Sequence, residues 1–271
     1  SGNMGIGLAQ ACSYYGMNLI CVVDTRTNEA NIKIMKAYGA KVERVTKPLR
    51  GSLLEARLAK VRYILDTVPG SFWPNQYANT SNPKAHQSTM AEIDLALGGD
   101  LDYLFVAAGT CGTLRGCSEY VRMHKMKTRI MAVDAIGSVI FGGLALSRLV
   151  PGHGAAIRPA IFRPGLADEV VYASDADCIR GCHALVSQDT ILAGGSTGAV
   201  VSAMHFVAPR IPKGSTVVLI CADRGERYLD TIYDEAWVAK HFPGIGLLED
   251  VPQCDLELSI EQTHMLGEAF V

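Results

Sequence analysis

The sequence predicts an α/β protein with two doubly wound parallel-sheet domains. Short apolar runs without polar alternation, such as residues 19–23 and 103–108, indicate parallel strands that are covered on both faces. These runs alternate along the chain with longer segments of helical periodicity. This order is expected when helices cover both faces of a parallel sheet.

The individual elements follow from periodicity and from the residues that end each segment. In the charged segment 52–66, for example, apolar side chains recur at helical spacing. Gly39 follows the predicted helix at residues 28–38 and closes it, as glycine commonly does at the end of a helix. Helices are expected over residues 6–15, 28–38, 52–66, 89–97, 113–124, 176–187 and 200–207. Strands are expected over residues 19–23, 42–45, 103–108, 129–134 and 216–222, with a short extended segment at 72–76.

A stretch rich in Asn, Pro and Ser at residues 77–88 is the candidate crossing between the domains. We therefore expect a smaller first domain over residues 1–85 and a larger second domain over 86–243. Residues 244–271 form a tail with six acidic residues and no Lys or Arg. This tail is predicted either to pack on a partner subunit or to form a solvated, lid-like segment.

Composition excludes several classes of protein. The chain has 271 residues, of which 49% are hydrophobic and 19% charged, so a large core rather than disorder is expected. A net charge of −2 provides no basic field for nucleic acid or an anionic membrane. The longest apolar stretch, 130–146, contains Asp134 and three glycines and is a poor membrane span. With no signal peptide in view, a cytoplasmic location is expected.

The eight cysteines are too few for a disulfide scaffold in a chain of this length. No Cys-x-x-Cys pair occurs, so neither a structural zinc site nor any other metal is expected. Several cysteines stand inside apolar runs. We therefore expect buried free thiols in a reducing compartment.

A turn rich in glycine and threonine follows the apolar run 103–108 and precedes a predicted helix. Residues 109–113 read Gly-Thr-Cys-Gly-Thr. Glycine lets a ligand approach the backbone, a helix start offers unpaired N–H groups, and threonine hydroxyls add donors. The turn suits a phosphate dianion, although the same residues would also make an ordinary strand-to-helix turn. It matches neither the P-loop nor the Gly-x-Gly-x-x-Gly fingerprint.

Two further turns have the same character. Residues 1–7 (Ser-Gly-Asn-Met-Gly-Ile-Gly) precede a helix whose N-terminus either holds a carboxylate or is simply capped. Residues 194–199 (Gly-Gly-Ser-Thr-Gly-Ala) precede another apolar helix. In an open parallel sheet such turns lie at the carboxyl ends of strands, where ligands bind.

Six collinear segments resemble the cysteine synthase family of pyridoxal-phosphate enzymes, which have fold type II (tryptophan synthase β-like). Residues 1–5 are similar to that family's asparagine loop, residues 75–86 to its Gln-Phe-x-Asn-Pro-x-Asn-x-x-x-His stretch, and residues 109–113 to its Gly-Thr-Gly-Gly-Thr phosphate cup. Residues 152–155 are similar to its Gly-Ile-Gly-Ala loop, residues 195–199 to its Gly-x-Ser-Ser-Gly-Ala turn, and residues 225–229 to its Gly-Glu-Arg-Tyr-Leu stretch. The resemblance implies pyridoxal 5′-phosphate as the cofactor, a mobile substrate-binding first domain and a cofactor-binding second domain.

One branch of this family resembles the chain most, through residues 21–24, 138–142 and 223–230. Its enzymes join O-phospho-L-serine to L-glutamate and make N-(2-amino-2-carboxyethyl)-L-glutamate, which supplies 2,3-diaminopropionate for siderophores and peptide antibiotics. The resemblance thus implies a transferase that performs β-replacement through an aminoacrylate. It also implies a homodimer.

The resemblance further implies roles for single residues. Asn3 would bond the 3′ oxygen of the cofactor, and the Ser196 hydroxyl would bond the pyridine nitrogen. The phosphate cup would consist of Gly109, Thr110, Cys111, Gly112 and Thr113. Substrate contacts are implied for Ser1, Gly2, Met4, Arg57, Gln76 and Tyr77, and the substrate carboxylate would be held by Ser1, Asn3 and Gln76.

Three of the candidate residues have a second interpretation. Arg57 would bind an anionic substrate or lie on a solvated helix face. Cys111 would be a nucleophile or, as we prefer, a small filler in the cup. His153 would carry protons or, again as we prefer, be a packed or solvated loop histidine.

The Schiff-base lysine of the family lies upstream of its asparagine loop, and none of the lysines in this chain stands in a matching motif. We therefore expect a preceding segment that carries this lysine; otherwise the chain is a remnant without activity. Three other functions stay open. They are a cysteine synthase that uses O-acetylserine or O-phosphoserine with sulfide, an inactive binding paralogue, and a nucleotide-binding regulator.

Overall fold

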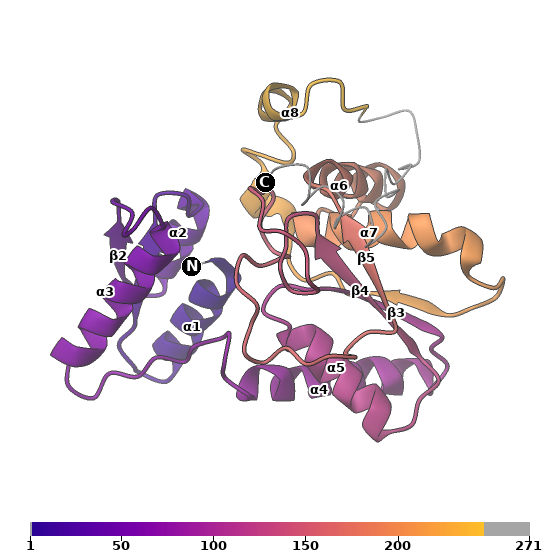
Figure 1. Ribbon diagram of the computed structural model, residues 1–271, viewed down its shortest axis with the longest axis horizontal. Coiled ribbons are helices and arrows are strands. Elements are labelled where there is room, and N and C mark those ends of the chain that lie inside the picture. The colour runs from indigo at the N-terminus through magenta and orange to yellow at the C-terminus, as the bar shows by residue number, and fades with distance from the viewer. Residues whose placement is uncertain (1, 247–271) are drawn as a thin grey trace. The chain divides into compact units, whose positions relative to one another are not determined.

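The chain divides into two compact units, which meet between Asn75 and Gln76 (Figure 1). The computed structural model describes residues 2–246, so the predicted tail lies outside the described residues from position 247 on. The sequence placed the division between residues 85 and 86. Residues 76–85 belong instead to the second unit, where residues 81–85 begin a helix.

The first unit is a small α/β unit with two parallel strands. Cys21 pairs with Val42 and Val23 with Arg44 in its sheet. Its core includes Ala9, Cys21, Val23 and Met35. The first helix approaches this core closely because Gly5 has no side chain. A Cβ at Gly5 would lie 2.6 Å from the Met35 sulfur. The elements are α1 (Gly2–Tyr14), β1 (Ile20–Asp24), α2 (Glu29–Ala37), β2 (Lys41–Val45) and α3 (Leu53–Thr67).

The second unit contains a four-stranded parallel sheet in the order β5-β4-β3-β6. The central strand β3 is almost entirely buried, which is why its sequence is a continuous apolar run rather than an alternating one. The predicted parallel α/β fold is therefore confirmed. The strands are β3 (Tyr103–Ala107), β4 (Arg129–Ala135), β5 (Glu169–Ala173) and β6 (Val217–Leu219).

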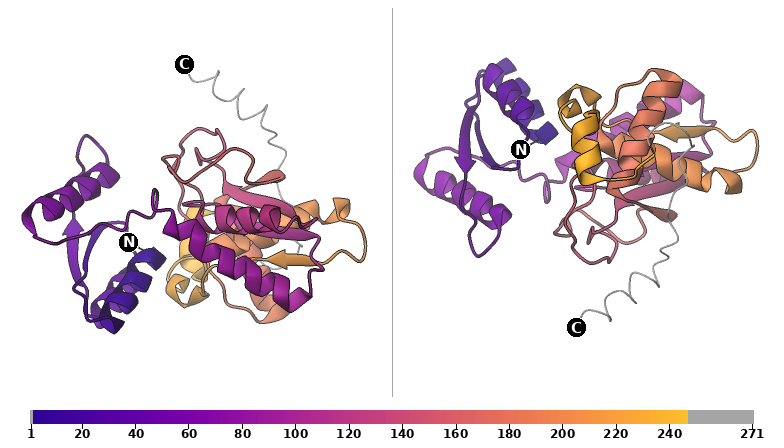
Figure 2. Two further views of the ribbon diagram at one scale, coloured as in Figure 1. Left: turned by 90° about the horizontal axis from the view of Figure 1, so that it is seen from below. Right: turned by 90° about the horizontal axis from the view of Figure 1, so that it is seen from above.

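Two pairs of helices cover the opposite faces of this sheet (Figure 2). One face, with Phe105 and Met131, packs against α6 (Asp175–Asp189) and α7 (Gly195–Val207). The other face, with Leu104 and Ile130, packs against α4 (Ser81–Leu97) and α5 (Gly112–Met123). Neighbouring residues of each strand thus enter different cores, as the alternation of side chains along a strand requires. The shorter helices are η1 (Ala208–Arg210), η2 (Gly225–Tyr228) and α8 (Glu235–His241).

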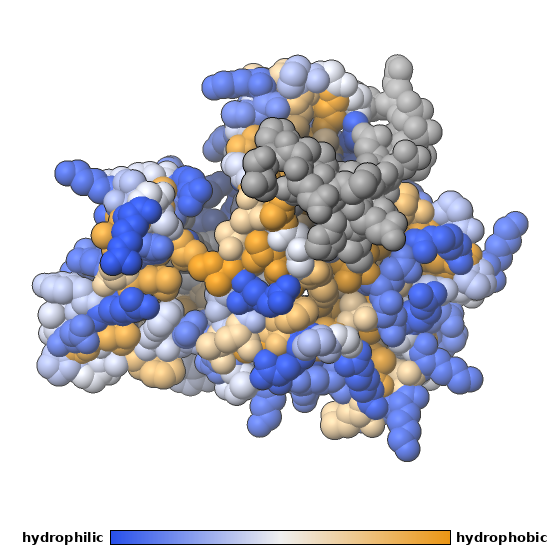
Figure 3. Space-filling view, in the orientation of Figure 1, coloured by the Kyte–Doolittle hydropathy of each residue, from blue (hydrophilic) through white to orange (hydrophobic). Residues whose placement is uncertain are grey.

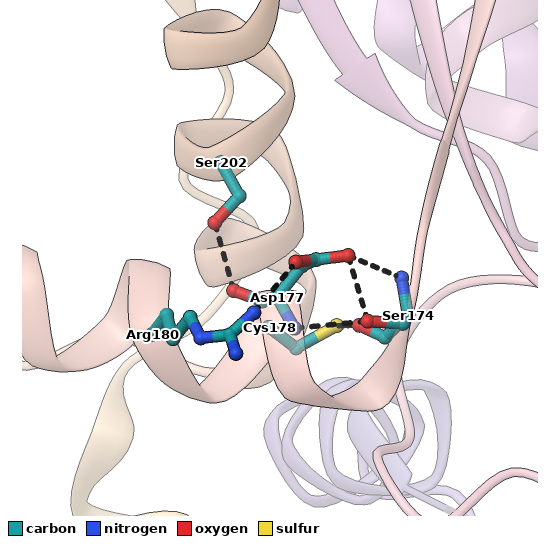
Figure 4. Close-up of polar contacts among 5 residues, drawn as sticks. All are labelled: Ser174, Asp177, Cys178, Arg180 and Ser202. Atoms are coloured by element: carbon teal, nitrogen blue, oxygen red, sulfur yellow. Dashed lines mark hydrogen bonds and ion pairs between the residues drawn. The ribbon is translucent and has the colours of Figure 1, made fainter. Parts of the chain in front are cut away.

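Helices α6 and α7 cross unusually closely at Gly181 and Gly198. A Cβ at Gly181 would lie 2.1 Å from the Gly198 carbonyl oxygen, and a Cβ at Gly198 would lie 1.9 Å from the Cys178 carbonyl oxygen. Polar contacts fix the same crossing (Figure 4). The Ser202 hydroxyl donates to the Asp177 carbonyl at 2.8 Å, while the Asp177 carboxylate completes a capping box with Ser174. The position of α7 is therefore tied to that of α6.

The structure differs from several predictions about elements. Helix α4 begins at Ser81 rather than at residue 89, because Pro83 stands in the first turn, where a missing N–H is tolerated. Residues 72–76, predicted as a short extended segment, lie in no helix or strand. Strand β5 was not predicted, since a segment without helix or strand, 136–168, precedes it. Helix α8 was not predicted either.

The face seen in Figure 3 carries hydrophobic residues in its middle part and hydrophilic residues mostly toward its edges. Exposed apolar side chains include Leu144, Leu146 and Leu149 in the irregular segment 136–168. No helix within residues 2–246 is long and apolar enough to cross a membrane. The seven described cysteines are all free thiols, five of them buried, as predicted; Cys254 lies outside the described residues.

Candidate functional site

The predicted phosphate cup lies at the carboxyl end of β3. Ala108 donates to Val133 of β4 at 2.7 Å, and the chain then turns through Gly109 and Thr110 into α5. Cys111 makes this turn in the left-handed region, with φ of 66°. A residue with a side chain in that region costs about 1–2 kcal/mol, so the cup holds Cys111 in a strained conformation.

The loop Gly152-His153-Gly154 lies between the cup and the start of helix α7. The Gly154 N–H donates to the Ala108 carbonyl at 2.6 Å. A Cβ on Gly109 would lie 3.4 Å from the Gly152 carbonyl oxygen, and a Cβ on Gly152 would lie 3.2 Å from the Ser196 Cβ. The structure therefore brings the cup and Ser196 to the same end of the sheet, on either side of Gly152.

Ser196 stands in the first turn of α7 and is 3% exposed. Contacts behind it hold the turn that leads into the helix. Gly194 donates to the Asp223 carbonyl at 3.1 Å, and the Tyr228 hydroxyl donates to the Asp223 carboxylate at 2.7 Å. The Tyr233 hydroxyl donates to the Ala193 carbonyl at 2.6 Å. Tyr228 of the Gly-Glu-Arg-Tyr-Leu stretch, for which the sequence indicated no role, thus helps Asp223 and Tyr233 to hold the turn before Ser196.

Three polar residues, Asp134, Ser138 and Arg148, lie near the loop that contains His153. Burial raises the pKa of Asp134 to about 6, although the Ser138 hydroxyl, the Ala135 N–H and the Arg148 charge all favour its ionised form. Arg148 donates to the His153 carbonyl at 2.7 Å. The Ala155 N–H donates to the Ser138 hydroxyl at 3.1 Å. Arg148 and Ser138 therefore fix the backbone at the His153 carbonyl and at the Ala155 N–H.

The environment of Cys111 and His153 favours the packing interpretation of each. Burial, followed by the nearby charge of Asp134, raises the pKa of Cys111 to about 12, so the thiol is protonated near neutral pH. Burial, followed by the charge of Arg148, lowers the pKa of His153 to about 4. The His153 side chain is packed against the Cys178 sulfur, 3.6 Å from Nε2. Neither residue has the exposure expected of a nucleophile or a proton carrier.

The predicted substrate-binding residues are spread over both units, and their contacts stay predictions. Gly2, Asn3 and Met4 form the first turn of α1, and Ser1 lies outside the described residues. Arg57 lies on α3, where its Nε is 3.1 Å from the carboxylate of Asp24, so its charge already faces a carboxylate.

Gln76 and Tyr77 immediately precede α4 in the second unit. The Tyr77 carbonyl accepts from Ile161 at 3.1 Å, and the Gln76 carbonyl accepts from Asn82 at 3.1 Å. Both backbones are therefore fixed to the body of this unit.

The residues at this end of the sheet fit a phosphorylated pyridine. The cup offers backbone N–H groups at the start of α5 and two threonine hydroxyls. Across the Gly152 loop, the buried Ser196 hydroxyl offers a neutral hydrogen-bonding partner. Within the described residues, no three His, Cys, Asp or Glu side chains cluster as they would around a metal ion.

Comparison with known proteins assigns the chain to a family. Residues 1–223 match the family described as pyridoxal-phosphate dependent enzymes. The chain belongs to this family, and pyridoxal phosphate is therefore its cofactor.

Solved structures similar to this chain are enzymes of the cysteine synthase type. An O-ureido-L-serine synthase is 27% identical with a TM-score of 0.79, covering 88% of this chain and 78% of its own. An O-acetylserine dependent cystathionine beta-synthase from Helicobacter pylori is 28% identical with a TM-score of 0.79, over 86% of this chain and 76% of its own. An O-acetylserine sulfhydrylase, isoform 3, from Entamoeba histolytica is 31% identical with a TM-score of 0.79, over 86% and 70%.

Proposed function

We propose that this protein replaces the β-substituent of an activated serine, joining O-phospho-L-serine to L-glutamate. The products are N-(2-amino-2-carboxyethyl)-L-glutamate and inorganic phosphate. The glutamate amine forms the new C–N bond to the β-carbon, and phosphate leaves with the electron pair of the broken C–O bond. The observation that carries the proposal is the placement of the threonine-rich cup and Ser196 on either side of Gly152.

The cofactor, when bound, acts as an electron sink for the removal of the α-proton and the loss of the β-substituent. The N–H groups of α5 and the hydroxyls of Thr110 and Thr113 would hold its phosphate. The Ser196 hydroxyl would bond the pyridine nitrogen and, as a neutral partner, would leave that nitrogen largely neutral. This neutral partner favours β-elimination over deeper carbanion chemistry.

The residues of the first unit are proposed to hold the amino-acid substrate. Asn3 lies in the first turn of α1, where the helix dipole favours a carboxylate, and Ser1 precedes this helix in the sequence. Arg57 supplies a guanidinium suited to a second anionic group. The sequence around residues 223–230 supports glutamate as the acceptor through its resemblance to the branch that makes this product.

Ser196→Ala tests the role of the hydroxyl. The variant should retain pyridoxal phosphate while its elimination rate falls, because the backbone around position 196 is held by other residues. Ser187→Ala, at an exposed position of α6, is the matched control and should keep the normal rate. Unchanged turnover in Ser196→Ala would remove the proposed role.

A cysteine synthase activity is the second candidate, and a specific observation favours it. The structural neighbours include an O-acetylserine sulfhydrylase at 31% identity. The full-length protein should be given O-phosphoserine or O-acetylserine together with equal amounts of glutamate and sulfide, and the products identified by mass. The glutamate adduct supports the proposal, cysteine alone would replace it with the second candidate, and no product from any pair would indicate an inactive binding paralogue.

A further inference from the structure

Two side chains of α4 lie directly behind the two threonines of the cup. The Asn82 Nδ2 is 3.3 Å from the Thr110 hydroxyl, and the His86 Nε2 is 3.3 Å from the Thr113 hydroxyl. Asn82 and His86 are four residues apart, so they lie one above the other on one face of the helix. Each threonine of the cup therefore has its own partner on the same helix.

Two glycines of α5 allow this close approach. A Cβ on Gly112 would lie 2.1 Å from the Asn82 Oδ1, and a Cβ on Gly116 would lie 2.2 Å from the Pro83 carbonyl and 2.6 Å from the His86 Cβ. The glycines are also four residues apart, so they match the spacing of the two side chains. The packing of α4 on α5 thus sets the two partners at the cup.

The direction of the Asn82 hydrogen bond follows from its second contact. The same Nδ2 lies 3.1 Å from the Gln76 carbonyl, which only accepts. The amide nitrogen must therefore face this carbonyl, and its other N–H points at Thr110. Since the Thr110 oxygen accepts from Asn82, the hydroxyl proton of Thr110 is left to be donated elsewhere.

The contacts of His86 permit the same direction at Thr113. Its Nδ1 lies 3.4 Å from the hydroxyl of Thr89, one turn further along α4. Burial lowers the pKa of His86, so the ring is neutral near neutral pH and carries one N–H. The Thr89 hydroxyl is able to donate to Nδ1, and in that tautomer the N–H is on Nε2 and donates to Thr113.

We propose that Asn82 and His86 are positioning residues that orient both threonine hydroxyl protons into the cup. Two protons directed at one point favour a ligand group that only accepts hydrogen bonds. A phosphate dianion is such a group, whereas a neutral hydroxyl also donates. This inference rests on the proposed assignment of the cup to the phosphate of the cofactor. It assigns to that site two further side chains that align the threonine donors before the ligand binds, as preorganised binding requires.

The test compares pyridoxal phosphate with pyridoxal, which lacks the phosphate, in binding to the full-length protein. The readout is the dissociation constant of pyridoxal divided by that of pyridoxal phosphate, both measured by equilibrium dialysis. His86→Phe and Asn82→Leu should each lower this ratio about three- to tenfold, the effect of one hydrogen bond. His86→Gln, which keeps a donor, should restore part of it, and Ser88→Ala, at an exposed position of α4, should leave it unchanged.

The possible outcomes separate the two proposals. If the unmodified protein does not distinguish the two ligands, the cup is not the phosphate site and the proposed function loses its basis. If the unmodified protein distinguishes them but His86→Phe and Asn82→Leu do so equally well, only the positioning role is refuted. Weaker binding of both ligands at an unchanged ratio also refutes it, because a merely structural role would act on both.

A second measurement does not depend on how the variants fold. Nitrogen NMR of the ¹⁵N-histidine-labelled protein reports which ring nitrogen of His86 carries the proton. We expect the proton on Nε2, and Thr89→Val should shift the population toward the Nδ1 form by removing the donor to that nitrogen. A proton on Nδ1 in the unmodified protein would overturn the direction assigned at Thr113.

Discussion

The close crossing of α6 and α7 makes Gly198→Ala the most informative single change for the fold around the site. The new Cβ would lie 1.9 Å from the Cys178 carbonyl oxygen and 2.7 Å from the Cys182 sulfur. Ordinary contact needs at least 3.4 Å, so the helices must separate by about 1.5 Å at this point. A backbone carbonyl cannot rotate away as a side chain does, and the shift must therefore involve the helices themselves.

The expected magnitude is the balance of two effects. Overpacking a core costs about 1–3 kcal/mol, and we take the upper end because the obstruction is backbone. Alanine is preferred over glycine inside a helix by about 1 kcal/mol. The free energy of unfolding of the second unit should therefore fall by about 2 kcal/mol. Cofactor binding should also weaken, since Ser196 is only two residues away on the displaced helix.

Urea denaturation followed by tryptophan fluorescence measures this effect in the second unit alone. The chain has two tryptophans; Trp237 packs against the core of the second unit, and Trp73 belongs to the first. In a Trp73→Phe background the fluorescence of Trp237 reports the second unit. Gly198→Ala should then unfold at a lower urea concentration.

The matched control is Gly7→Ala in α1. No atom lies within 4 Å of a Cβ at Gly7, so only the helix preference acts and the first unit should be stabilised by up to about 1 kcal/mol. In a Trp237→Phe background, Trp73 reports this change. If Gly198→Ala also stabilises its unit, the inference of a steric conflict at the crossing is wrong.

Three further predictions concern charge and reactivity. Arg57→Ala should raise KM for the anionic substrate at least tenfold, as expected for a lost charged hydrogen bond, whereas Arg62→Ala on an exposed part of the same helix should not; equal KM values would make Arg57 a structural partner of Asp24. Burial raises the folded-state pKa of Asp134 to about 6. The folded state thus binds more protons than the unfolded state, and stability falls as pH rises from about 4 to 6; Asp134→Asn should lack this fall in denaturation series at several pH values. Iodoacetamide with peptide mass analysis should label exposed Cys221 well before buried Cys111; equal rates would show that the cup opens.

Predicting the local elements from the sequence succeeded where the pattern was strong. The buried strand β3 is a continuous apolar run, and the glycine- and threonine-rich turn follows it directly. Strand β5, which is as long as β1, β2 and β3, was missed because it follows a long irregular segment that gives no periodic signal before it. The first turns of α4 were missed because Asn, Pro and Ser are typical of both loops and helix starts.

The sequence by itself determined the fold class and the kind of ligand, because both are written in short contiguous stretches: apolar runs for buried strands, and glycine with threonine for an anion at a helix start. Only the tertiary structure decided which side chains from other parts of the sequence contact those stretches. Asn82 and His86 reach the cup from another helix, and Asp223, Tyr228 and Tyr233 hold the turn before Ser196 from the far end of the chain. Such contacts depend on how closely two helices or loops approach, and that distance is set by packing between residues that are remote in sequence.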